Sequence, residues 1–296
     1  MKTADPNQDS VQIFTELYYE TSEFMKTFGP LFSAHLTGAR RQRPFCRMSV
    51  CETMTVLIGF QPIGGHNFRQ YYKDTVLQFH RAEFSAPVSY SRFCETAPAA
   101  LIPLILFLKF RMEPSLHTMI YVPDSASLSV CINPGIRHHR VFAETAGRFY
   151  GFRLHPVINS IGELMAVRIT GGNTDDRKPF RDMVKKLKGK LSGDKGCISA
   201  KPAADPAEHG LEMITALRKN MKKQYIASAD RILPRKRAVT ESVRDLPKNF
   251  FQTEHSRHRS FFGFAANLFS ALIAYIFYPK KPHMRGIDLK KTLITL

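Results

Sequence analysis

The sequence has few cysteines, and they lack the spacing of a disulfide framework or a redox pair. Its five cysteines are scattered over 296 residues, and no two of them form a C-x-x-C motif. Disulfide frameworks need paired cysteines and an oxidising compartment, so this pattern predicts reduced thiols in a cytosolic protein. Cys46 and Cys51 have the spacing of half a zinc site, but no second ligand pair follows, and we expect no zinc there.

Long apolar runs are also scarce, and the N-terminus has none. Residues 1–10 are polar and lack the apolar core of a signal peptide, so we expect no secretion signal. One uncharged stretch, residues 261–278, is about long enough to span a membrane. It contains Gly263, Asn267 and Ser270 and has basic residues on both sides, which gives no orientation signal. We predict a buried helix of a globular domain; a basic membrane-surface protein anchored through this stretch is the alternative.

Acidic residues are few relative to basic ones. The chain has 43 Lys+Arg against 25 Asp+Glu, a formal net charge of +18. An excess of this size favours a polyanionic partner, either nucleic acid or an anionic membrane surface. Hydrophobic residues make up 44% of the chain, which is enough to bury the core of one large domain or two ordinary ones.

From residue 10 to residue 111 the hydrophobic residues recur at the spacing of α-helices. Ser49 and Glu52 form a capping box, a pair that starts a helix by satisfying backbone N–H groups of its first turn. Short helices separated by Gly and Pro suit a helix-turn-helix-like DNA-binding module, and they suit any small helical bundle equally. We therefore predict an all-α, DNA-binding domain over residues 1–112.

After residue 118 the period changes to that of β-strands. We expect strands at 119–122 (ending at Asp124 and continuing over 128–132), 149–158, 163–170, 190–192 (reaching Asp194) and 211–217, with helices over 178–187 and around Glu241. This β-β-β-α-β-α-β-α order is that of the RNase H-like fold, an α/β fold whose mixed five-stranded sheet has the order 3-2-1-4-5. We predict this domain over residues 113–282, followed by a tail over 283–296.

Three acidic residues fall at separate elements of this predicted domain: Asp124, Asp194 and Glu241. The first and fourth strands are neighbours in the predicted sheet, at a spacing of about 4.8 Å, so the two aspartates would lie within reach of shared metal ions. Hard divalent cations take oxygen ligands, and carboxylates from different elements are what a two-metal phosphoryl-transfer site needs. Asp175 and Asp176 follow the third strand, which is farther away, and are predicted to cap a helix.

The passages that carry a family resemblance are Asp124-Ser125, 149–155, 172–179, 193–196, 217–222, 235–237 with Glu241, 255–260 and 279–282. In these passages the chain resembles the DDE transposases of bacterial insertion sequences, specifically the insertion-sequence nine-eighty-two group, from about residue 11 to residue 282. Ala126, Cys197 and Thr240 depart from the residues that are usual in that family, which indicates a diverged copy.

The resemblance implies cleavage of DNA at terminal inverted repeats, followed by strand transfer into target DNA. Asp124, Asp194 and Glu241 would hold two Mg²⁺ ions, with Mn²⁺ as a substitute. The resemblance further implies a homodimer acting on paired DNA ends at the nucleoid, in the bacterial cytoplasm and not at a membrane. It also makes residues 261–278 the buried C-terminal helix of the catalytic domain.

Eight basic residues are candidates for contact with DNA phosphates: Lys195, Arg218, Lys219, Lys222, Lys223, Arg235, Lys236 and Arg237. A solvated basic face is the alternative for each of them. Phosphate contacts would make DNA binding fall steeply with salt. Two other functions stay open, a catalytically decayed DNA-binding remnant and an RNase H-like nuclease that cuts without strand transfer.

Overall fold

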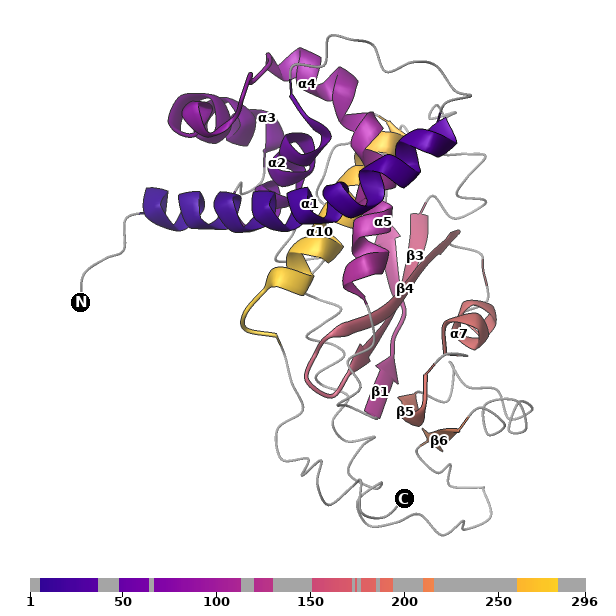
Figure 1. Ribbon diagram of the computed structural model, residues 1–296. Coiled ribbons are helices and arrows are strands. Elements are labelled where there is room, and N and C mark those ends of the chain that lie inside the picture. Colours follow the sequence, from indigo (N-terminus) through magenta and orange to yellow (C-terminus); the bar gives the residue numbers. More distant parts are fainter. Residues whose placement is uncertain are drawn as a thin grey trace, which may run out of the picture. The chain divides into compact units, whose positions relative to one another are not determined.

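The computed structural model describes residues 6–36, 48–63, 67–112, 120–129, 151–171, 174, 177–184, 187–193, 210–215 and 260–281. The chain divides into two compact units, which are described one at a time. The helical unit comprises Met1–Arg111 and Phe251–Phe277, and the sheet unit comprises Met112–Phe250 and Tyr278–Leu296. Figure 1 shows helices in the first and strands in the second, so the predicted change of period near residue 118 is confirmed.

The helical unit begins with a long helix and continues as short ones. Its elements are α1 (Pro6–Leu36), α2 (Val50–Ile63), α3 (Phe68–Gln70), the π-helix η1 (Tyr71–Phe79), η2 (Arg81–Glu83), α4 (Tyr90–Thr96), η3 (Ala97–Ala100), α5 (Leu101–Arg111) and α10 (Phe261–Phe277). The side chain of Asn67 caps α3, and that of Ser89 caps α4, because each accepts a hydrogen bond from a backbone N–H of the first turn.

The core of the helical unit forms around α2. Met54, Val56 and Ile58 on α2 are fully buried. Gly59 is needed where α1 comes close, since a Cβ at this position would lie 2.8 Å from Cε1 of Phe14. A larger residue at position 59 would therefore force α1 and α2 apart.

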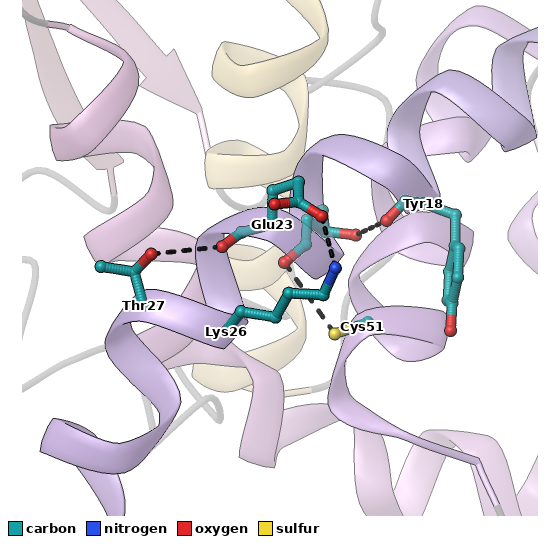
Figure 2. A network of polar contacts seen from close by, with 6 residues as sticks. Tyr18, Glu23, Lys26, Thr27 and Cys51 are labelled. Atoms are coloured by element: carbon teal, nitrogen blue, oxygen red, sulfur yellow. Dashed lines mark hydrogen bonds and ion pairs between the residues drawn. The ribbon is translucent and has the colours of Figure 1, made fainter.

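Buried polar contacts, rather than surface ion pairs, join α1 to α2. The Thr21 hydroxyl donates to the Leu17 carbonyl and lies 3.3 Å from the Thr55 hydroxyl, while the Cys51 thiol donates to the Thr21 carbonyl at 3.9 Å. Figure 2 draws the Cys51 thiol and, in the same view, the solvent-exposed ion pair of Lys26 and Glu23. Exposed pairs within one helix contribute little to stability, so we assign the pair of Lys26 and Glu23 no role in the α1–α2 contact.

The predicted capping box at the start of α2 is confirmed. The Ser49 N–H donates to Oε2 of Glu52 at 2.6 Å, and the Glu52 N–H donates to the Ser49 hydroxyl at 3.1 Å. The other carboxylate oxygen of Glu52 accepts from the N–H and the hydroxyl of Ser85. Burial by itself would raise the pKa of Glu52, but these hydrogen bonds from Ser85 and Ser49 outweigh it and lower the pKa below its ordinary value.

Replacing Glu52 by glutamine is expected to cost about 1–3 kcal/mol of unfolding free energy at neutral pH, because buried donors lose a charged acceptor. Since the folded-state pKa is lowered, the carboxylate's contribution is fully present above the unfolded pKa of about 4.3 and is lost as the pH falls through the folded value. Urea unfolding of both proteins between pH 7 and pH 3 measures this. Equal differences at both ends would contradict the assignment, and the exposed Glu23→Gln is the control.

Helix α10 packs with the helices that begin the chain. It contacts α2 and α5, and the side-chain amide of Gln61 on α2 donates to Oδ1 of Asn267 at 2.8 Å inside the unit. The guanidinium of Arg111 lies 5.0 Å from the ring centre of Phe277. The predicted burial of this helix is confirmed, but its predicted place in the catalytic domain differs from what we observe. Because α10 is apolar nearly all round, it needs covering on several sides, which α2 and α5 provide.

A second apolar stretch lies within the same unit. Taken as one run, Tyr90–Arg111 is long and apolar enough to cross a membrane by length and composition. A core helix of a folded bundle passes the same test, and Phe93, Leu104 and Phe107 on this run are fully buried. The run is interrupted by the 3₁₀ turn η3 and carries the ion pair of Arg92 and Glu95 near its start.

The sheet unit contains the strands and one described helix. Its elements are β1 (Ile120–Pro123), β2 (Ala126–Ser129), β3 (Gly151–Asn159), β4 (Leu164–Gly171), α7 (Arg177–Val184), β5 (Gly189–Gly193) and β6 (Leu211–Thr215). The hairpin turn predicted after β3 is confirmed: Oδ1 of Asn159 accepts from the N–H groups of Ile161 and Glu163, and Gly162 has a φ of 80°. Each expected strand is present within the described residues, while the expected ends at 119, 130–132, 149–150 and 216–217 lie outside them.

The sheet is mixed, as predicted, but its order differs in detail. Among the described residues it has six strands: β3 pairs with β4 on one edge, and with both β1 and β2 on the other, always antiparallel. Strands β1 and β5 are parallel, as are β5 and β6. Strand 1 of the predicted order 3-2-1-4-5 is thus divided into two strands, β1 and β2. Asp124 and Ser125 lie between them.

The core of the sheet unit lies between the sheet and α7. Tyr121, Val157, Met165 and Leu191 from four strands form a buried cluster with Phe180 and other side chains of α7. At the surface the Arg168 guanidinium of β4 pairs with the Asp182 carboxylate of α7 at 3.0 Å. The strand side chains in this cluster point toward α7, so they mark the face of the sheet that α7 covers.

Candidate active site

Asp124 lies immediately after β1 and is half-buried. Its N–H donates to the Pro156 carbonyl on β3 at 3.1 Å, and its Oδ1 accepts from the Ser125 N–H at 2.8 Å. The first bond continues the β1–β3 ladder by one residue, and the second holds the carboxylate close to its own backbone. One hydrogen bond thus holds the backbone of Asp124, and the other holds its carboxylate.

The strands that precede two of the expected acids in the sequence, β1 and β5, pair in parallel. Ile120 is in register with Lys190, and Tyr121 with Leu191. β1 is followed by Asp124, and β5 ends at Gly193, the residue before Asp194. The strand ends that precede these two acids thus lie on neighbouring parallel strands, as the sequence predicted for the first and fourth strands.

Asp124 lies on the face of the sheet opposite to α7. Tyr121 and Leu191 point into the cluster beneath α7. Successive residues of a strand point to opposite faces, so Ile120 and Val122 point the other way. Because the Asp124 N–H continues the ladder, Asp124 shares their face.

The remaining predicted site residues lie outside the part of the chain that the structure describes. These are Asp194, Glu241, Lys195, Arg218, Lys219, Lys222, Lys223, Arg235, Lys236 and Arg237. Within the described residues no group of three or more His, Cys, Asp or Glu side chains could hold a metal ion. Asp124 nonetheless fits such a site, because it provides a carboxylate at the end of a strand and next to a parallel neighbour.

A protein-family model matches part of the chain. Residues 115–261 match the model described as "Transposase DDE domain". This segment is a transposase DDE domain. Comparisons with curated proteins and with solved structures found no match. The match begins just before β1 and ends at the first residue of α10, so nearly all of α10 lies beyond it.

Several general properties follow from the presence of a DDE domain. Such a domain implies transposition activity, which is carried out on DNA, and it is typically catalytic. Proteins with this domain generally use divalent metals, which agrees with an acidic residue at the end of β1. The mixed sheet preceded by helices is consistent with the domain as well.

Two consecutive buried residues of β3, His155 and Pro156, have different surroundings. His155 is fully buried, its Nε2 lies 2.8 Å from the Thr170 hydroxyl, and its ring packs edge-on against Phe180. His155 therefore lies in the buried core, against Phe180 of α7. Pro156, which follows it, bonds directly to Asp124 and was not among the predicted site residues. The signal in the sequence was a proline inside a predicted strand.

Proposed function

We propose that this protein is a DDE transposase of the insertion-sequence nine-eighty-two group, which cuts DNA at transposon ends and joins them to target DNA. The observation that supports this most is the parallel pairing of β1 with β5 inside a DDE domain. β1 leads directly to Asp124, and its parallel neighbour β5 ends at Gly193, the residue before Asp194 in the sequence. Neighbouring strands are about 4.8 Å apart, which suits two carboxylates that share metal ions.

In this proposal Asp124, Asp194 and Glu241 hold two Mg²⁺ ions, for which Mn²⁺ can substitute. The bound metal would supply an activated oxygen nucleophile and neutralise charge at the scissile phosphate. The Ser125 N–H restrains one oxygen of the Asp124 carboxylate, so this ligand is oriented before the metal arrives. The Pro156 carbonyl anchors the backbone of the same residue.

The same proposal assigns DNA contact mainly to the DDE domain. Most of the chain's positive excess lies after residue 111, and this part contains all eight basic candidates, from Lys195 to Arg237. The described helices of the helical unit, in contrast, carry acidic and basic residues in similar numbers. We further propose that the protein acts as a homodimer on paired terminal inverted repeats, in the bacterial cytoplasm at the nucleoid.

The test is cleavage of a DNA duplex that carries the sequences flanking the gene, with full-length protein. Cleavage is expected with Mg²⁺ and not with EDTA, and it should be lost in Asp194→Ala and in Glu241→Ala. Unchanged cleavage in Asp194→Ala would reject the assignment of the site. Hydrolysis without joined products would identify a nuclease instead, and salt-sensitive binding without any cleavage would identify a decayed remnant.

A further inference from the structure

The interruption between β1 and β2 lies opposite a proline, Pro156, on β3. Pro123 is in register with Val157, and Ala126 with Leu154, so both strands follow β3 in one uninterrupted register. Asp124 and Ser125 are the residues that separate the two strands, and the N–H of Asp124 donates to the carbonyl of Pro156. The interruption therefore lies opposite a proline, without a shift of register.

Proline has no N–H, so Pro156 cannot donate a ladder bond to the Asp124 carbonyl. In an antiparallel pair of the hydrogen-bonded kind, two opposite residues exchange two bonds. The Pro156 carbonyl points toward Asp124, so its nitrogen points the same way and cannot return a bond to Asp124. On its other edge β3 is covered by β4, where Pro156 is in register with Val167. β3 is therefore an interior strand, in which proline is ordinarily avoided.

We propose that Pro156 is a positioning residue for Asp124, an inference that rests on the proposed role of Asp124 as a metal ligand. Because Pro156 omits one ladder bond, its pair with Asp124 keeps the bond from the Asp124 N–H alone, and β1 ends at Pro123. The Ser125 N–H then holds the Asp124 carboxylate, as is seen at 2.8 Å. A residue with an N–H at position 156 would add the second bond of the Asp124 pair and join β1 and β2 into one regular strand.

The experiment compares full-length wild type with Pro156→Ala in the absence of DNA. Calorimetric titration with Mg²⁺ is expected to show about tenfold weaker binding in the variant, the usual effect of losing a group that orients a ligand. Amide hydrogen exchange in metal-free protein should show slower exchange over residues 120–129, because the ladder has gained a donor. Pro156→Val, a better strand former, provides the same two readouts should the alanine variant fail to fold.

A matched control is Val157→Ala, which removes buried side-chain volume from the next residue and leaves the ladder unchanged. It should lower stability without weakening Mg²⁺ binding. Unchanged exchange over residues 120–129, or Mg²⁺ binding as tight as in wild type, would overturn the role of Pro156. If wild type and Asp124→Ala bind Mg²⁺ equally well, the proposed function fails instead, and the exchange data still decide whether Pro156 interrupts the ladder.

Discussion

Replacing Asp124 by alanine is expected to reduce metal-dependent DNA cleavage by about a thousandfold or more, which corresponds to several kcal/mol of transition-state stabilisation. The reason is that Asp124 provides the proposed metal carboxylate at the end of β1, beside the strand that leads to Asp194. The side chain is half-buried, and its hydrogen bond to the Ser125 N–H joins adjacent residues. We therefore expect the Asp124→Ala variant to remain folded. Rates measured at saturating Mg²⁺ and at equal amounts of folded protein, judged by circular dichroism, check this.

Asp182→Ala is the control for this measurement. Asp182 is an exposed aspartate of the same sheet unit, and its carboxylate pairs with Arg168 at the surface. Its loss should leave cleavage within about twofold of wild type, because an exposed ion pair contributes little. If Asp124→Ala and Asp182→Ala cleave DNA at the same rate, Asp124 holds no essential metal and the proposed site is wrong.

Replacing Leu272 by alanine is expected to lower the unfolding free energy by about 2–5 kcal/mol, the cost of truncating a buried leucine. Leu272 lies on α10 and is 2% exposed. Because α10 packs against α2 and α5, the loss should appear in the helical unit although the mutation lies after the DDE domain. Urea unfolding measures the size of the loss, and amide exchange locates it by faster exchange in α2 and α5.

Phe262→Ala on the same helix is the matched control. Phe262 is 53% exposed, so its truncation should change stability by about 0.5 kcal/mol or less. Faster exchange confined to β3 and β4 in Leu272→Ala would show that α10 supports the sheet unit instead, as the sequence interpretation had it.

The local features of the fold were predictable because neighbouring residues produce them. Ser49 and Glu52 form their capping box within one helical turn, and Asn159 closes the turn after β3 through hydrogen bonds to residues just beyond it. Alternation of side chains likewise indicated β3 and β4. Asp124 was recognised as a candidate ligand in the same way, since it directly follows an apolar strand.

Other features depend on residues that are distant in sequence. The interruption at Asp124 depends on Pro156, more than thirty residues later, whose missing N–H acts only once β3 lies beside β1. Likewise the apolar pattern of α10 predicts burial, but it does not specify a partner. The observed partners, α2 and α5, provide the amide of Gln61 for Asn267 and a cover for Phe277. Such choices are made by complementary packing in three dimensions, which a one-dimensional pattern does not contain.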